Sequence, residues 1–204
     1  MHVWGRRAGL VGRIHRLDER VDEVWGRALR GRPAIDRTFY LASELGDFSL
    51  IWHLIGAAQG LRSDEDADAT ARLAVVLLAE SVLVNQGVKR LVRRPRPLHE
   101  AIRPHALRTP STSSFPSGHA SSAFTAAGVL ADRDPSLAPL YYGVAAVVAT
   151  SRLHVRIHHA SDVVAGAVLG MVLAKLALRA WPLPPRGAHP DTSGTPGTPA
   201  TGTA

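Results

Sequence analysis

The stretch from Ser151 to Ala180, SRLHVRIHHASDVVAGAVLGMVLAKLALRA, joins a polar beginning to a long apolar continuation. Arginines, histidines and an aspartate crowd its first twelve residues, whereas Val163–Ala174 carries no charge. The segment 160–181 is long enough for a helix that crosses the ~30 Å of hydrocarbon in a bilayer. Charge-free helices that alternate with charged connections are typical of an integral membrane protein.

Four further segments share this character: residues 38–60, 71–88, 117–131 and 137–152. The third contains many small residues between Ala120 and Gly128, which predicts close packing against neighbouring helices. We therefore predict an all-α fold for residues 38–181, a membrane-embedded bundle of about five spanning helices. The predicted location is the cell membrane, as a multi-pass protein.

Both ends of the chain differ from this bundle. Residues 1–37 form a basic segment in which apolar residues recur at three- and four-residue spacing over 13–32. That pattern predicts an amphipathic helix on the bilayer surface or on the bundle, and an ordinary solvated helix fits it equally well. Residues 182–204 are rich in Pro, Gly and Thr without periodicity, and we expect a disordered tail.

Composition limits the classes of partner. The net charge is +7, which suits either nucleic acid or a combination of anionic lipid and bound phosphate. Aromatic residues make up only 5% of the chain, too few for base-stacking platforms, so we predict a lipid partner and no nucleic acid. The absence of cysteine excludes disulfides, thiol catalysis and zinc–thiolate sites.

Three polar clusters stand at ends of the predicted helices: Lys89–Pro97, Pro116–His119 and Ser151–Asp162. In the first, Lys89 supplies a point charge and Arg96 a planar fork, and together they suit the oxygens of a phosphoryl group. Basic residues at the end of a span are also ordinary interfacial anchors. The first cluster alone is therefore ambiguous.

The other two clusters suit phosphate chemistry as well. Ser117 and Gly118 describe a turn into a helix, whose N-terminal N–H groups attract an anion. His158 and Asp162 are four residues apart, so on a helix they would share a face. The carboxylate would then accept a proton from one imidazole nitrogen and leave the other free to attack. A turn or a surface His–Asp pair is common singly, but three phosphate-binding clusters in one chain favour a phosphate site.

These residues resemble the type 2 phosphatidic acid phosphatase family over about residues 40–180. The family pattern is Lys-x6-Arg-Pro, Pro-Ser-Gly-His and Ser-Arg-x5-His-x3-Asp, and all three parts are present. The resemblance implies that His158 is the nucleophile that forms a phosphohistidine, that His119 protonates the leaving group and that Asp162 orients His158. It implies no metal and no other cofactor. The implied phosphate-binding residues are Lys89, Arg96, Ser117, Gly118 and Arg152.

Near-duplicates accompany the motif residues. Arg94-Pro95 mimics Arg96-Pro97, but only Arg96 has the family's spacing from Lys89. His154 and His159 flank His158, but only His158 has the motif's spacing. Many relatives have glycine two positions before the nucleophile, where this chain has Arg156, and we expect an extra cation near the site.

The resemblance implies an integral-membrane phosphatase for a lipid phosphate monoester or diphosphate. Phosphatidic acid, phosphatidylglycerol phosphate and polyprenyl phosphates or diphosphates all remain candidates. The alternatives are a vanadium-dependent haloperoxidase-like enzyme, a phosphatase of soluble substrates and a non-catalytic phosphate-binding protein. Since the haloperoxidases are soluble, the apolar helices argue against the first.

Basic residues bear on the orientation in the membrane. With five spans, 18 of the 24 basic residues fall on the same side as the three clusters. The positive-inside rule then predicts a cytoplasmic active site. Analogy with bacterial relatives favours the outer face instead.

Overall fold

The computed structural model describes residues 9–97, 107 and 112–183, and within these ranges it contains helices and no strands. The predicted all-α class is confirmed. The long helices are α1 (Leu10–Leu29), α2 (Pro33–Leu45), α3 (Leu50–Gly60), α4 (Asp64–Val82), α6 (Gly118–Arg133), α7 (Ala138–His154) and α8 (Ala160–Ala180). Short helical segments connect them: η1 (Asp47–Ser49), the π-helical η2 (Leu83–Val88), α5 (Lys89–Leu91) and η3 (Pro135–Leu137).

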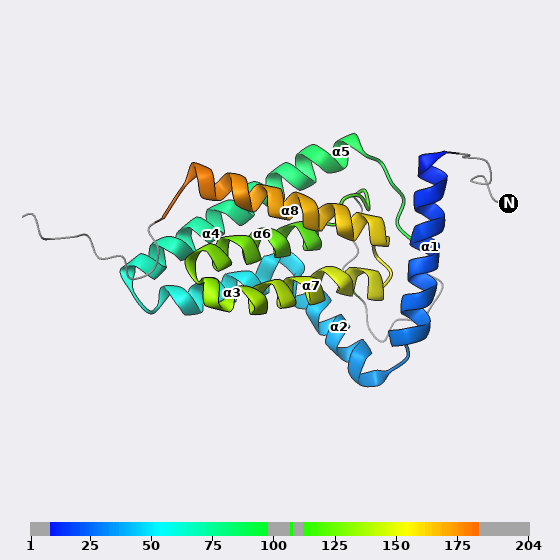
Figure 1. Cartoon of the computed structure of the whole chain (residues 1–204), viewed down its shortest axis with the longest axis horizontal. Helices are drawn as coiled ribbons and strands as arrows, with labels where there is room; N and C mark the ends of the chain where they lie inside the picture. The colour runs from blue at the N-terminus through cyan, green and yellow to red at the C-terminus, as the bar shows by residue number, and fades with distance from the viewer. Residues whose placement is uncertain (1–8, 98–106, 108–111, 184–204) are drawn as a thin grey trace, which may run out of the picture.

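The chain passes back and forth along one bundle axis (Figure 1). It runs from α2 through η1 into α3, returns through α4, η2 and α5, and then follows α6, α7 and α8 in turn. Helix α6 lies at the centre, packed against α7, α8 and α4. The clusters that follow α4, precede α6 and separate α7 from α8 therefore all lie at one end, which we call the site end.

Small residues permit the close contact between α6 and α8. A Cβ on Gly166 would lie 2.4 Å from the Ser117 carbonyl oxygen, and a Cβ on Gly170 would lie 2.2 Å from that of Ser121. No side chain fits at such distances. On the α6 side, Ala120, Ala123 and the following small residues are buried, in agreement with the packing predicted for that segment.

The first two passes differ from their predicted bounds. The segment predicted as one helix over 38–60 begins earlier, because Pro33 suits the first turn of α2, and it breaks after Leu45. At the break Phe48 and Ser49 have left-handed φ values of 53° and 59°. The second pass begins at Asp64 rather than near residue 71. The Ser63 hydroxyl accepts from the Asp66 N–H at 3.2 Å, and acidic residues in the first turn favour the helix N-terminus.

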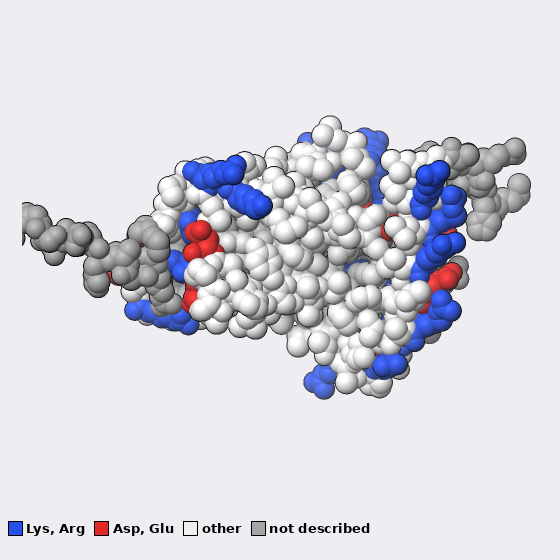
Figure 2. Space-filling view, viewed as in Figure 1, with Lys and Arg blue, Asp and Glu red and all other residues white. Residues whose placement is uncertain are grey.

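The outer surface of the bundle is apolar along its middle. Large side chains such as Leu54, Leu78, Leu140 and Val164 are more than half exposed. In Figure 2 this middle is white, while Lys, Arg, Asp and Glu gather at the two ends. Among the residues that the structure describes, α8 is the helix that is both long and apolar enough to cross a membrane by itself. The other passes are shorter or include charged residues.

Helix α1 lies across the site end rather than along the bundle (Figure 1). It begins at Leu10, three residues before the predicted start. Asp18 is buried against the bundle and Trp25 is partly buried, while Leu10, Leu17 and Val24 are at least 60% exposed. The helix therefore packs on the bundle through polar contacts and leaves an apolar stripe uncovered. The predicted tail from residue 184 onward lies outside the described residues.

Candidate active site

The three sequence clusters meet at the site end. The Ser117 N–H, at the start of α6, donates to the Asp162 carbonyl in the first turn of α8 at 3.0 Å. Lys89, at the end of the second pass, lies close to the start of α6, since a Cβ on Gly118 would be 3.3 Å from the Lys89 Nζ. The structure thus brings together helix ends that lie 73 residues apart in the chain, from Lys89 to Asp162.

Lys89 is buried, and its Nζ donates to Asn85 Oδ1 at 2.9 Å. Asn85 lies in the π-helical turn η2, a local geometry that often occurs at functional sites. The ammonium group is held against the N-terminus of α6, where free N–H groups already favour an anion. Lys89 and Gly118 therefore form one side of a site with positive potential.

Helix α6 begins at Gly118, as the turn pattern predicts. Ser117 is its N-cap, and the Ser117 hydroxyl accepts from the Ala120 N–H at 3.4 Å. This hydroxyl therefore helps to hold the helix end. The first N–H groups of a helix have no carbonyl partner within the helix, so those of Gly118 and His119 can bind an anion.

His158 lies in the turn before α8 and not on a helix. Its Nδ1 is 2.6 Å from the Ser114 carbonyl oxygen, and its Nε2 is 3.2 Å from Arg96 Nη1. A carbonyl only accepts, so Nδ1 must carry the hydrogen and the lone pair lies on Nε2. Arg96 Nη1 also donates to the Ile157 carbonyl at 3.0 Å. The imidazole is thus held with its unprotonated nitrogen beside a guanidinium group.

Asp162 is placed differently from the helical-face prediction. Its Oδ2 is 3.7 Å from His158 Nδ1, too far for a hydrogen bond, but accepts from the His159 N–H at 2.9 Å. The reason is that α8 begins only at Ala160, so the pair does not lie on one helix and Asp162 caps the helix start. The Ser114 carbonyl is the direct hydrogen-bond partner, and Asp162 acts on His158 over a slightly longer distance.

The surroundings of His158 keep its imidazole neutral. Burial lowers the pKa of His158 to about 3, and the charges of Arg96 and Arg152 lower it further against the opposing effect of Asp162. A nucleophile must have a free lone pair, and a neutral imidazole has one. Burial also lowers the pKa of Arg96 from its ordinary value.

His119 lies on the first turn of α6 and contacts the first pass. Its Nε2 is 3.2 Å from the Ser43 carbonyl oxygen and 3.1 Å from Asp47 Oδ1. Gly46 lies beneath the ring, since a Cβ there would be 2.6 Å from His119 Cδ2. Arg152 donates to the Ser43 hydroxyl. The break in the first pass therefore supports the histidine, a role that the sequence marks only by a Gly-Asp pair in an otherwise apolar segment.

The near-duplicate residues have separate partners. Arg94 Nη1 lies 2.5 Å from Asp162 Oδ1, whereas Arg96 is the arginine at His158. His154 Nε2 is 2.8 Å from Asp36 Oδ1, and the Trp25 indole donates to the other ring nitrogen of His154 at 3.1 Å. Arg94 and His154 therefore lie beside the site, but neither takes the position of its motif counterpart, Arg96 or His158.

Arg156 does not supply the expected extra cation to the phosphate cluster. Its Nη2 pairs with Asp22 Oδ2 on α1 at 3.2 Å. Its φ of 52° lies in the left-handed region that favours glycine, which is the residue expected at this position from the family resemblance. Arginine here accepts backbone strain and gains a contact with α1.

Comparison with known proteins decides the family. The sequence profile of the PAP2 superfamily matches residues 69–184, more than half of the chain and all three clusters. The chain belongs to the PAP2 superfamily. It is 37% identical to the decaprenylphosphoryl-5-phosphoribose phosphatase of Mycobacterium tuberculosis, over 73% of this chain and 82% of that protein. The Mycolicibacterium smegmatis protein of the same name is also 37% identical, over 68% and 75% of the two chains.

Two solved structures share the fold. The transmembrane PAP2-type phosphatidylglycerolphosphate phosphatase of Bacillus subtilis aligns with a TM-score of 0.63 and 24% identity, over 82% of this chain and 86% of that one. Aquifex aeolicus LpxE aligns with a TM-score of 0.64 and 22% identity, over 80% and 95%. Because the family matches and the mycobacterial relatives are phosphatases, this PAP2 protein is a phosphatase, a hydrolase of phosphoric esters.

Proposed function

We propose that this PAP2 protein hydrolyses a lipid phosphate through a phosphohistidine on His158. The observation that carries the proposal is the fixed tautomer of His158. The Ser114 carbonyl holds the hydrogen on Nδ1, and Nε2 lies beside Arg96. This arrangement presents a lone pair in a cluster of cations where a phosphoryl group would be bound.

The proposed reaction has two steps. First His158 Nε2 attacks phosphorus in line, the P–N bond forms as the P–O bond to the lipid breaks, and His119 donates a proton to the leaving oxygen. Lys89, Arg96 and Arg152 stabilise the charge on the three equatorial oxygens, together with the N–H groups at Gly118. Then water attacks phosphorus, His119 takes the proton from the water and the P–N bond breaks, which releases phosphate and restores both histidines.

For the substrate class, we propose a phosphate monoester carried by a polyprenyl lipid. Support comes from the mycobacterial relatives, which are named for a decaprenylphosphoryl-5-phosphoribose substrate and align over most of their own length. Phosphatidic acid, phosphatidylglycerol phosphate and polyprenyl diphosphates are the competing substrates. Their headgroups would meet the same cations, so the discrimination must come from the sugar and the tail.

We propose further that the five passes all cross the bilayer of the cell membrane, with the site end at its cytoplasmic face. The apolar middle of Figure 2 supports the crossing. Exposed arginines on α1 support the orientation, because α1 lies at the site end and carries Arg13, Arg16, Arg20 and Arg27. A reporter fused to the C-terminus should then be active outside the cytoplasm. Cytoplasmic activity of the reporter would reverse the orientation.

The substrate proposal is tested with the full chain purified in detergent. Phosphate release is measured from a polyprenyl-linked phosphosugar, phosphatidic acid, phosphatidylglycerol phosphate, a polyprenyl diphosphate and a soluble aryl phosphate. We expect the highest kcat/KM for the polyprenyl phosphosugar. Preference for another lipid would change the substrate class, and preference for the aryl phosphate would contradict a lipid phosphatase. Halide oxidation after addition of vanadate would favour the haloperoxidase alternative.

A further inference from the structure

Helix α1 lies outside the matched region 69–184, yet one of its carboxylates reaches the start of α8. Asp18 is only 3% exposed. Its Oδ1 accepts from the Ser161 N–H at 2.8 Å, and its Oδ2 accepts from the Ser161 hydroxyl at 2.7 Å. Asp18 Oδ2 also accepts from Arg94 Nη2 at 2.6 Å. A buried charge with this many partners is held in one place.

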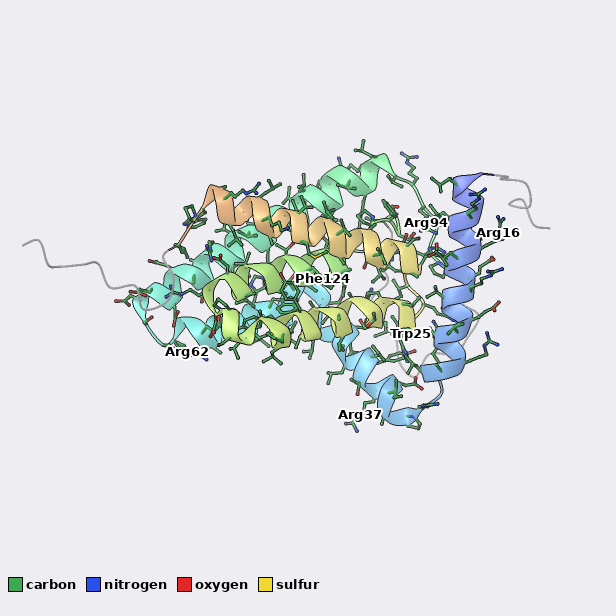
Figure 3. All side chains as sticks on the ribbon, viewed as in Figure 1. Arg16, Trp25, Arg37, Arg62, Arg94 and Phe124 are labelled. Atoms are coloured by element: carbon green, nitrogen blue, oxygen red, sulfur yellow. The ribbon has the colours of Figure 1, made fainter. Side chains whose placement is uncertain are left out.

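Arg94 connects Asp18 with the support of the nucleophile. Its Nη1 donates to Asp162 Oδ1 at 2.5 Å and to the Ser161 hydroxyl at 2.7 Å. Its main-chain carbonyl accepts from the N–H of Ser114, the residue whose own carbonyl holds His158. Figure 3 shows Arg94 where the start of α8 meets α1. One arginine is therefore bound both to the carboxylate behind His158 and to the segment that fixes the tautomer of His158.

Arg94 determines which carboxylate oxygen of Asp162 faces His158. Arg94 occupies Asp162 Oδ1 through a single nitrogen, since its other terminal nitrogen is bound to Asp18. Oδ2 is thereby left for the His159 N–H and faces His158 Nδ1. Without Asp18, the guanidinium group is free to form a two-pronged pair with Asp162, the geometry that arginine and carboxylate prefer. That pair would draw Oδ2 away from the histidine turn.

We propose that Asp18 and Arg94 form a positioning pair, through which helix α1 holds Asp162 and the Ser114 segment behind the catalytic histidine. This inference rests on the proposed role of His158. Asp18 touches neither substrate nor reacting atoms, and it acts through Arg94. The surface helix is then part of the catalytic apparatus and not only a cover of the bundle.

The test compares Asp18→Asn with Asp22→Asn, one turn further along α1. Asp22 also binds α1 to its surroundings, through Arg30 and Arg156, but does not contact Arg94. Measured are kcat, KM and the melting temperature on the same detergent-purified enzyme and lipid. We expect Asp18→Asn to lower kcat roughly tenfold, within the range for coupled residues of one hydrogen-bond network, with little change in KM. Asp22→Asn should leave kcat unchanged.

A double-variant cycle tests the route through Arg94. Arg94→Gln should lower kcat at least as much as Asp18→Asn, and the double variant should be no slower than Arg94→Gln alone. The positioning role is contradicted if the two losses multiply, if Asp22→Asn slows the enzyme equally or if only the melting temperature falls.

If the Asp18→Asn protein does not fold, the comparison of Arg94→Lys with Arg94→Gln decides. Lysine keeps the charge but lacks the fork, so the pair predicts equal losses, and full rescue by lysine contradicts it. Should wild-type enzyme form no phosphohistidine, the proposed function fails, whereas normal wild-type chemistry with unaffected variants removes only this inference.

Discussion

The two ends of the bundle use buried cations in different ways. At the end with the α3–α4 turn, where Figure 3 labels Arg62, Arg133 pairs with Asp66 at 3.2 Å and Arg72 with Asp132 at 3.2 Å. These pairs connect α6 to α4. At the site end, Lys89, Arg96 and Arg152 lie around His158, His119 and the N-terminus of α6. The same residue types thus tie helices together at one end and surround the imidazoles at the other, where we propose that the phosphate binds.

The largest effect should come from the proposed nucleophile. His158→Ala should lower kcat by about 10⁴-fold or more, because no neighbouring group replaces an attacking nitrogen. His159→Ala is the matched control, since His159 contacts Asp162 but not Arg96. Its loss should be about tenfold or smaller, as for a residue that orients another. An inactive His159 variant beside an active His158 variant would show that the nucleophile is misassigned.

Replacing one arginine at each end distinguishes a cation that binds the phosphate from a cation that holds two helices together. Arg96→Gln should lower kcat about 10²-fold, as for loss of one donor to a developing charge, and leave the melting temperature nearly unchanged. Arg133→Gln removes the arginine that pairs with the buried carboxylate of Asp66 and should cost about 3 kcal/mol of stability. The folded Arg133 variant should keep wild-type kcat. Equal effects of both variants on kcat would remove the distinction between the ends.

Glycines in the middle of the bundle provide a smaller test, of packing alone. Gly170→Ala should destabilise the protein by about 1–3 kcal/mol, because its Cβ would collide with the Ser121 carbonyl. Gly143→Ala is the control, since nothing lies within 4 Å of a Cβ there. The control should be neutral or slightly stabilising. Thermal unfolding in detergent measures both, and equal losses would contradict the close contact between α6 and α8.

The smallest effect should be that of acid on the nucleophile. The pKa of His158 is lowered by burial to about 3, so the imidazole stays neutral as pH falls through ~6.5, where an ordinary histidine takes up a proton. The rate of phosphoenzyme formation, followed by rapid quench, should therefore show no loss from protonation of the nucleophile in that range. In the unfolded chain His158 does take up the proton, so its contribution to stability is present above ~6.5 and is lost as pH falls below that value. A fall in phosphoenzyme formation that follows an ordinary histidine titration and is insensitive to His119→Gln would contradict the buried site.

Much of this architecture is visible in the sequence because its signals are local. Apolar runs mark the passes, and the three clusters mark the ends that meet. The sequence does not predict the break after Leu45, because the segment 38–60 is apolar enough to suggest one helix and only the Gly46-Asp47 pair indicates otherwise. The break supports His119 through a contact between residues more than seventy positions apart in the chain, which a local sequence pattern does not reveal.

Other details of the site are hidden for different physical reasons. The partner of His158 Nδ1 is the main-chain carbonyl of Ser114, and every residue has such a carbonyl. The four-residue spacing to Asp162 suggested a helical face, but the helix begins too late for that geometry. Motif spacing predicts the position of Arg96 in the site. It does not predict the role of Arg94, whose partner on α1, Asp18, is 76 residues away.

The most direct test of the proposed chemistry is to locate the phosphoryl group on the enzyme. Wild-type protein is mixed with its lipid phosphate, quenched within one turnover, digested and analysed by mass spectrometry. The proposed mechanism predicts phosphate on His158, formed as fast as the lipid is consumed, and none on the His158→Ala protein. Rapid turnover without any phosphorylated histidine, or phosphate on His154 or His159 instead, would contradict it.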